Sequence, residues 1–326
     1  MTARWRQCAV FACTVALLCS CGSDGFDTVD NPAVVPAAQA GQVIVLHAGL
    51  EKTGSVSTRA SQSYQEGSID PSMSLGLVVA THGGSDPAEH CDNAKYKIDE
   101  EGTMQPDVEE GDDAPTWPEG AVDLYCYLPY NAGFSLAGPN VFRVQADQRE
   151  KEGYLASDLA WGKILNATAG GDNNVMLRHC IPRVLVLFEL SKGFDPEVME
   201  GATVQLLNTV VEGTLDMATG ELTTSEKSNE TTGDITVFEY GGGIQTGYAL
   251  TMPQVIAKGT RVARITLANG TTRSVTLNGK FTLKENTDNQ LTILLSGQGS
   301  TFTAERASFV EGGEYTIGAE RSEEDE

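Results

Sequence analysis

Residues that could bind a metal ion gather in one short stretch of the chain: His82, His90, Cys91 and Asp92. Their spacing matches neither a recognised ligand pattern nor the i, i+4 face of a helix, which favours a solvated loop. The acidic run Asp107–Asp113 could hold calcium, but it lacks the alternating spacing and turn glycine of an EF-hand loop. We therefore expect no metal ion and no other cofactor.

Motifs that would indicate catalysis or nucleotide binding are missing from the sequence. The glycine run at 241–243 follows a strand-like segment, but no helix or lysine comes after it in the place that a phosphate loop requires. There is no GxSxG motif, no nucleotide fingerprint and no pairing of a nucleophile with a base. We therefore expect a protein that is not an enzyme. The remaining alternative, a secreted hydrolase, would require a carboxylate pair or a metal site that comes together only in the folded domain.

Three cysteines, Cys91, Cys126 and Cys180, lie in the part of the chain that follows the N-terminal leader. They are widely spaced and contain no CxxC pair, so neither a zinc site nor a disulfide framework is indicated, and at most one disulfide could form. Cys126 and Cys180 both lie in strand-like runs. Burial as free cysteines, which behave as small hydrophobic residues, is the preferred interpretation.

The first 20 residues have the pattern of a secretory signal. Arg4 and Arg6 form a cationic start, and the apolar run Cys8–Leu18 that follows is too short to span a membrane as a stable helix. No later segment offers an apolar run near the ~20 residues that a membrane span needs.

The end of this leader, Leu18-Cys19-Ser20-Cys21, resembles a bacterial lipobox. The resemblance implies a signal peptide over residues 1–20 and acylation of Cys21, the new N-terminus. Acyl chains such as palmitate would then anchor the protein to a membrane without any protein span. Residues 21–41, rich in Ala, Pro and Asp, predict a flexible tether. A signal-peptidase cut without lipid is the alternative.

The charge of the chain excludes two classes of partner. With 45 acidic and 22 basic residues the formal net charge is −23, so no basic surface is left to neutralise nucleic-acid phosphates or to dock on anionic lipid. Hydrophobic residues make up 40% of the chain, which is enough to form ordinary cores. The length of 326 residues predicts about two domains at roughly 150 residues each.

Short strand-like runs separated by turn residues follow one another along the chain. They are Gln42–Ala48, Leu75–Thr81, Ala121–Tyr130, Val141–Ala146, Thr203–Leu207, Ile235–Tyr240, Tyr248–Met252, Arg261–Leu267, Thr272–Leu277, Leu291–Ser296 and Glu314–Ala319. Such runs, with almost no helical periodicity, predict an all-β protein built of antiparallel sandwiches. In Ala121–Tyr130 the residues Val122, Leu124, Cys126 and Leu128 alternate with Tyr125 and Tyr127, so the two sets face opposite sides of one strand.

A Gly/Asn-rich break within Ala156–Gly171 predicts a linker between an N-terminal domain, residues 42–168, and a C-terminal domain, residues 172–320. The acidic tail 321–326 follows. Pro182 interrupts the apolar run Val175–Leu190 and predicts two strand pieces or a bulge there.

Two Asn-Gly pairs mark expected turns between later strands. Asn269-Gly270 predicts a type I′ hairpin, and Asn278-Gly279 predicts a further turn.

Eight segments, taken in order, resemble motifs of the fimbrillin family, the type V pilus subunits and related surface lipoproteins of Bacteroidales. The segments are Gln42–Ala48 with Thr58-Arg59-Ala60, Asp92–Ile98, Val122–Tyr130, Phe142–Ala160, Val175–Leu190 with His179, Gly213–Leu222, Gly279–Leu295 and Phe309–Ile317. The resemblance covers nearly the whole chain after the leader and implies two tandem transthyretin-like β-sandwich domains.

The resemblance also implies a function, namely a stalk, tip or accessory subunit of a surface fimbrium (pilus) that takes part in cell adhesion. Subunits of this kind are lipid-anchored at the cell outer membrane and join other fimbrial subunits by donor-strand exchange. A trypsin-like protease cuts in an N-terminal loop, the first strand leaves, and an extended segment of a neighbour takes its place. A host or bacterial surface receptor is a further implied partner.

Carried onto this sequence, the candidate for the processed bond is Arg59–Ala60, which lies in a Ser/Thr-rich loop. A surface arginine that is never cut is the alternative. The strand lost is Gln42–Ala48, and the donor candidate is Glu314–Ala319, whose residues Tyr315, Ile317 and Ala319 share one face. The tail 321–326 is too acidic to enter an apolar groove, so it would remain outside.

The competing hypothesis is a lipoprotein that does not polymerise and binds a glycan or a protein. It requires an exposed aromatic cluster, for which Trp117, Tyr125 and Tyr127 are the compact candidates, although burial is the simpler interpretation of Tyr125 and Tyr127.

Overall fold

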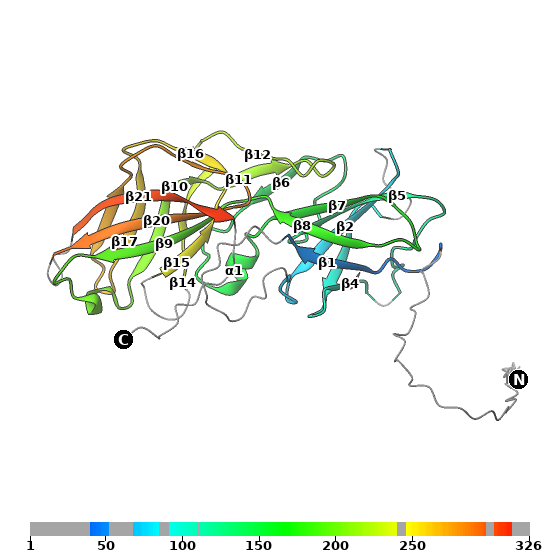
Figure 1. Cartoon of the computed structure of the whole chain (residues 1–326), viewed down its shortest axis with the longest axis horizontal. Coiled ribbons are helices and arrows are strands. Elements are labelled where there is room, and N and C mark those ends of the chain that lie inside the picture. Colours follow the sequence, from blue (N-terminus) through cyan, green and yellow to red (C-terminus); the bar gives the residue numbers. More distant parts are fainter. Residues whose placement is uncertain are drawn as a thin grey trace, which may run out of the picture. The chain divides into compact units, whose positions relative to one another are not determined.

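A computed structural model describes residues 40–51, 68–84, 91–109, 111–239, 246–297 and 303–314. Strands dominate these residues, and their only helical elements are the short helix α1 (Lys151–Leu155) and the 3-10 turn η1 (Pro196–Met199) (Figure 1). The all-β prediction is therefore confirmed. Among the described residues, no helix combines the length and the apolar character that crossing a membrane requires.

The strands fall into two sets along the chain. The first set is β1 (Leu46–Leu50), β2 (Ser74–Thr81), β3 (Ala94–Ile98), β4 (Thr103–Pro106), β5 (Val122–Leu128), β6 (Asn140–Arg143), β7 (Ala160–Ala167) and β8 (Asn174–His179). The second set is β9 (Arg183–Leu190), β10 (Thr203–Val210), β11 (Glu212–Leu215), β12 (Leu222–Thr224), β13 (Thr232–Thr236), β14 (Phe238–Glu239), β15 (Thr246–Leu250), β16 (Gln254–Ile256), β17 (Arg261–Thr266), β18 (Thr272–Thr276), β19 (Phe281–Leu283), β20 (Thr287–Ser296) and β21 (Thr303–Glu314).

Seven strands of the first set form a closed barrel in the order β1-β4-β3-β2-β5-β7-β8. The second set forms a four-stranded sheet (β13-β10-β17-β18), a five-stranded sheet (β14-β15-β9-β20-β21) and a two-stranded sheet (β16-β19), while β6 joins β11 and β12. The ladders between the described strands are antiparallel except for two parallel pairs, β1 with β8 and β9 with β20.

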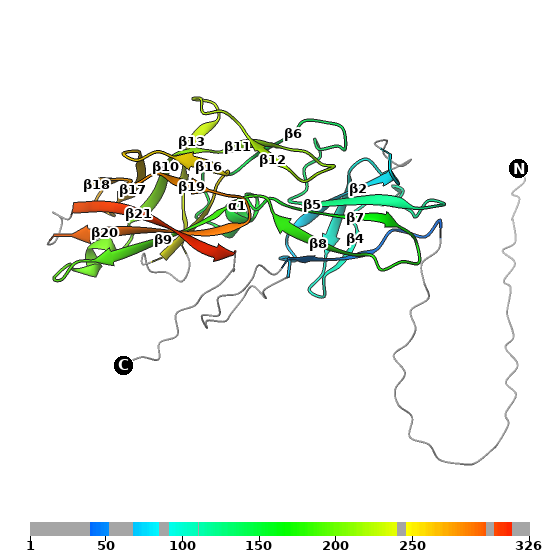
Figure 2. The same cartoon turned by 45° about the horizontal axis from the view of Figure 1, so that its top comes forward.

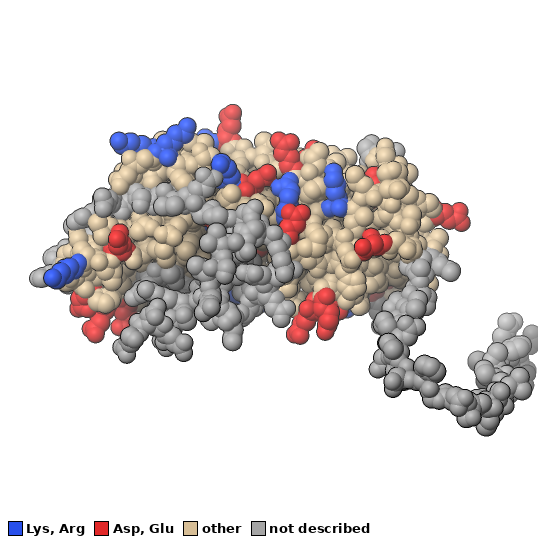
Figure 3. Space-filling model, in the orientation of Figure 1, with Lys and Arg blue, Asp and Glu red and all other residues tan. Residues whose placement is uncertain are grey.

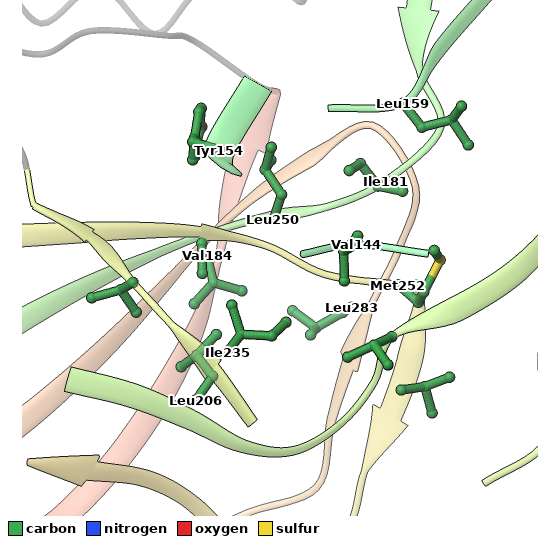
Figure 4. Packing of buried hydrophobic residues seen from close by; sticks show 14 of the residues in the cluster. Val144, Tyr154, Leu159, Ile181, Val184, Leu206, Ile235, Leu250, Met252 and Leu283 are labelled. Atoms are coloured by element: carbon green, nitrogen blue, oxygen red, sulfur yellow. The ribbon is translucent and has the colours of Figure 1, made fainter. Parts of the chain in front are cut away.

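Two hydrophobic clusters share the strand β5, because both of its faces are buried. Leu124 and Cys126 point into the cluster inside the barrel, whereas Tyr125 and Tyr127 belong to a second cluster that extends through the later strands. The predicted alternation of this strand is thus confirmed. Figure 4 shows the second cluster, in which side chains of β9, β10, β13, β15 and β19 converge; they are Val184, Leu206, Ile235, Leu250 and Leu283.

Proline separates two strands where the sequence predicts a break. β8 ends at His179 and β9 begins at Arg183, so the two pieces flank Pro182, which cannot donate a ladder hydrogen bond. The linker predicted over Ala156–Gly171 is wrong, because half of it is β7. β8 lies in the barrel with the strands that precede it, rather than with those that follow as expected.

The hairpin predicted at Asn269-Gly270 forms between β17 and β18, but its turn type differs from the prediction. Gly270 has a φ of +83°, whereas Asn269 is not among the described residues with positive φ, and a type I′ turn needs positive φ at both positions. The amide of Leu267 instead donates to the carbonyl of Thr271, which makes a longer turn.

Candidate functional site

The strand β1 closes the barrel by bridging β4 and β8. It runs antiparallel to β4, where Leu46 pairs with Met104, and parallel to β8 from His47 to Leu50. Figures 1 and 2 show β1 and β8 side by side from two directions. Taking β1 away would leave β4 and β8 as two facing edges with unpaired backbone groups, which is the kind of slot that an added strand fills.

Hydrogen bonds continue along the residues that precede β1. The amide of Ile44 donates to the carbonyl of Pro115 (2.9 Å), and the amide of Trp117 donates to the carbonyl of Gln42 (2.8 Å). The buried Tyr96 hydroxyl on β3 donates to the carbonyl oxygen of Ile44 at 3.1 Å. We call residues 41–51 the β1 ribbon, since this whole stretch is bound to the barrel and not only its regular strand.

Side chains of the β1 ribbon alternate between the core and the surface. Ile44, Leu46, Ala48 and Leu50 are buried in the barrel cluster, with exposed fractions between 0% and 7%. Val45, by contrast, is 44% exposed. The ribbon therefore supplies one row of apolar side chains to a core that the other six barrel strands cannot close alone.

The thiols of Cys91 and Cys126 lie in the same barrel cluster, and Cys180 lies in the second cluster. All three are free and buried, as predicted for Cys126 and Cys180. Burial raises the pKa of the Cys91 and Cys180 thiols from 9.0 to about 12, and it raises the pKa of Cys126 further. The thiols are thus uncharged packing groups and not nucleophiles.

Two of the four histidines are paired with carboxylates. His179 Nδ1 lies 2.7 Å from Asp158 Oδ1 in a fully buried pair, and His82 Nδ1 lies 2.7 Å from Asp123 Oδ1 nearer the surface. In the described part of the chain, no three metal-ligating side chains converge. His90 lies outside that part, and so does the glycine run 241–243.

Several predicted site residues also lie outside the described residues. They are Cys21, Arg59, Ala60, Tyr315, Ile317 and Ala319. The structure does place the two segments next to them: the β1 ribbon precedes Arg59, and β21 ends at Glu314, one residue before Tyr315. Contacts of Tyr96 and of the stretch 115–117 with the ribbon were not predicted, because their partner is backbone and leaves no side-chain signal.

The aromatic cluster required by the competing hypothesis is not at the surface. Trp117, Tyr125 and Tyr127 have exposed fractions of 1%, 6% and 0%. Tyr127 packs on Phe134 and donates a hydrogen bond to Asn93, so its ring and its hydroxyl are both engaged. Within the described ranges, none of the large hydrophobic side chains that are exposed is aromatic.

Comparison with solved structures finds a similar fold in two proteins of low sequence identity and a weaker likeness to a third. A candidate cell adhesion protein of Bacteroides ovatus is 14% identical, with a TM-score of 0.64 over 86% of this chain and 100% of that one. A candidate cell adhesion protein of Bacteroides uniformis is 16% identical, with a TM-score of 0.55 over 83% and 98% of the two chains. The tip fimbrial protein Mfa3 of Porphyromonas gingivalis matches at 10% identity and a TM-score of 0.40, over 74% and 94%.

Comparison by sequence gives a family. No curated protein sequence matches the chain. The profile of one family, described as fimbrillin-like, matches residues 58–307, which is well over half of the chain. The chain therefore belongs to the fimbrillin-like family.

Proposed function

We propose that this protein is a structural subunit of a surface fimbrium, in a stalk, tip or accessory position, and that it joins other subunits by donor-strand exchange during cell adhesion. Membership of the fimbrillin-like family supports a fimbrial or adhesive role. The exchange mechanism is supported mainly by the β1 ribbon, which completes the core of the barrel and precedes Arg59 in the chain. A cut at Arg59–Ala60 would separate the ribbon covalently from the other barrel strands.

The energetics of the ribbon favour replacement over an open slot. Burying an Ile or Leu side chain contributes about 1.5–3 kcal/mol, so withdrawing Ile44, Leu46 and Leu50 costs about 5–9 kcal/mol. The whole stability of a domain is of order 5–15 kcal/mol. A barrel without the ribbon is therefore close to unfolding unless another apolar strand occupies the slot. The proposed donor segment includes Tyr315, Ile317 and Ala319 of a neighbouring subunit.

An arginine-specific protease tests this proposal on the full chain. We expect one cut after Arg59, followed by oligomers that resist mild denaturant, and no cut in Arg59→Ala. Lys52→Ala is the matched control, since it removes the other basic residue of the segment 52–67 and should leave processing unchanged. A chain that stays uncut and monomeric would remove the polymerising role.

Cysteine labelling reports on the slot directly. Withdrawal of the ribbon should expose Cys91 and Cys126 to a thiol reagent, because both line the cluster that the ribbon completes. Cys180 belongs to the second cluster and should remain protected, which makes it an internal control. Equal labelling of all three thiols would indicate global unfolding and would contradict a local exchange.

Attachment to the outer membrane through a lipid on Cys21 is the second part of the proposal. The residues 21–41 would tether the folded part to that lipid. Labelled palmitate should be incorporated into the chain and into Cys19→Ser but not into Cys21→Ser. Incorporation that persists in Cys21→Ser would place the anchor elsewhere.

A further inference from the structure

Basic residues are concentrated in one segment of this acidic protein. Residues 253–284 contain six Lys and Arg residues and no Asp or Glu, although the whole chain carries a formal charge of −23. In Figure 3 blue side chains gather along the upper left of the molecule, around the part labelled β16 in Figure 1. The segment forms β16 to β19 and the turns between them.

Strand pairing brings three of these cations to one place. Ile256 of β16 pairs with Phe281 of β19. Lys258 lies two residues after Ile256, and Lys280 lies directly before Phe281, so both lysines lie at the same end of this strand pair. The amide of Gly259 donates to the carbonyl of Leu277 at 2.9 Å, which joins the turn at Lys258 to the end of β18, and Arg261 begins β17 beside it. We call Lys258, Arg261 and Lys280 the basic patch.

The basic patch is available for a partner. All three side chains are exposed, and none forms an ion pair with the described part of the chain. An apolar residue lies near two of them: Val255 in β16 is 50% exposed and pairs with Thr282 of β19, two residues after Lys280. An exposed apolar side chain with charges around it has the anatomy of a protein–protein contact.

A patch of the same design but of opposite charge lies beside the β1 ribbon. Residues 99–119 contain nine Asp and Glu residues and no Lys or Arg. Among them Glu109, Asp112 and Asp113, which we call the acidic patch, are exposed and form no ion pair with the described residues, whereas Asp107 is paired with Lys95 at 2.6 Å.

The acidic patch is also built around an apolar residue. Val108 is 44% exposed and precedes Glu109 directly. The chain then continues from Asp113 to Pro115, the residue that accepts the hydrogen bond from Ile44 of the β1 ribbon. The acidic patch therefore stands at the entrance to the proposed exchange slot.

We propose that the basic patch of one copy of this protein docks on the acidic patch of a second copy. Opposite charges steer the two surfaces together, and Val255 and Val108 supply the apolar contact. The two patches are different surfaces of the same chain, so the contact is head-to-tail and leaves one free patch at each end, which permits a row of subunits. The inference extends the proposed function by naming a contact outside the strand slot, but it does not require exchange.

A zero-length carbodiimide cross-linker, which joins lysine to carboxylate, tests the contact on the uncut full chain. In a mixture of isotopically labelled and unlabelled protein, we expect peptides that join Lys258 or Lys280 of one copy to Glu109, Asp112 or Asp113 of another. The yield should fall as salt shortens the Debye length from about 10 Å at 0.1 M to about 3 Å at 1 M. Cross-links that map elsewhere, or only within one copy, would overturn the proposal.

Charge reversal provides the matched test. The double variant K258E/K280E also removes the lysines that carbodiimide joins, so the dimer fraction is measured here by analytical ultracentrifugation without a cross-linker. That fraction should fall about tenfold, since like charges then face each other. K192E/K227E makes the same change in net charge at two exposed lysines outside the basic patch and should leave the dimer fraction unchanged. Equal losses in both variants would show a nonspecific effect of net charge and would overturn the proposal.

Mixing two reversed variants tests specificity. K258E/K280E and D112K/D113K should each fail to dimerise alone, and their mixture should recover the cross-linked dimer. A mixture that does not recover would contradict the pairing. If Arg59 processing fails while the uncut chain still cross-links, only the exchange proposal is refuted. If strand exchange is equally fast in K258E/K280E and in the unsubstituted protein, and the uncut unsubstituted protein gives no cross-link, only the contact between the patches is refuted.

Discussion

Leu46→Ala measures how strongly the β1 ribbon is integrated into the barrel. Leu46 is 1% exposed, belongs to the barrel cluster and pairs with Met104 across the ladder to β4. Truncating a buried Leu removes its transfer free energy and leaves a cavity, and the cost is about 2–5 kcal/mol. We expect a value of about 3 kcal/mol, because the strand lies at the wall of the barrel and its neighbours can partly close the gap.

Urea unfolding of the uncut chain gives the free energy of unfolding of both proteins. Val45→Ala is the control, since Val45 neighbours Leu46 on the ribbon but is 44% exposed, and a surface change of this kind costs within about 0.5 kcal/mol. The effect of Leu46→Ala should disappear after cleavage at Arg59 and exchange, because the ribbon has then left. A Leu46→Ala variant as stable as Val45→Ala would refute the claim that the ribbon completes the core.

Three further predictions concern groups buried elsewhere. Burial raises the pKa of Cys91 to about 12, so above pH 9 the unfolded chain loses a proton that the native state keeps. The free energy of unfolding should therefore fall by about 1.4 kcal/mol per pH unit up to pH 12. Cys91→Ala should lack this part of the pH dependence. Asp288→Asn should cost about 3–5 kcal/mol in urea unfolding, because Asp288 holds the buried Arg183 through two bonds of 2.6 Å. Gly76→Ala should cost about 1–3 kcal/mol, since a Cβ there would lie 2.1 Å from the Tyr127 ring, and a variant as stable as the parent would show that the ring can move.

Local patterns in the sequence were sufficient to predict the strands that are buried on both faces or interrupted by proline. The alternation of Leu124 and Tyr125 predicts two opposite faces, and the structure places each face in its own cluster. Pro182 predicts the end of one strand and the start of another because it lacks an amide donor. These signals depend only on residues a few positions apart.

Long-range pairing left no comparable signal. β7 was predicted as part of a linker because its neighbourhood is rich in Gly and Asn, yet its pairing with β5 and β8 overrides that preference. The parallel pairing of β1 with β8 joins His47 to Asn174, and no periodicity reports a contact between residues so distant in the chain. The pairing that holds the ribbon between β4 and β8 is therefore visible only in the fold.

Tyr96→Phe tests whether a single hydroxyl retains the β1 ribbon. The Tyr96 hydroxyl and the Ile44 carbonyl that it bonds are both in the barrel interior, and the substitution leaves that carbonyl without this donor at a cost of about 1–3 kcal/mol. After cleavage at Arg59 the ribbon should be released about tenfold faster from the variant, as followed by labelling of Cys91. Tyr127→Phe is the control, because its hydroxyl bonds Asn93 and not the ribbon. Equal release rates in the two variants would show that the apolar side chains alone hold the ribbon, and that an incoming strand need not present a carbonyl to Tyr96.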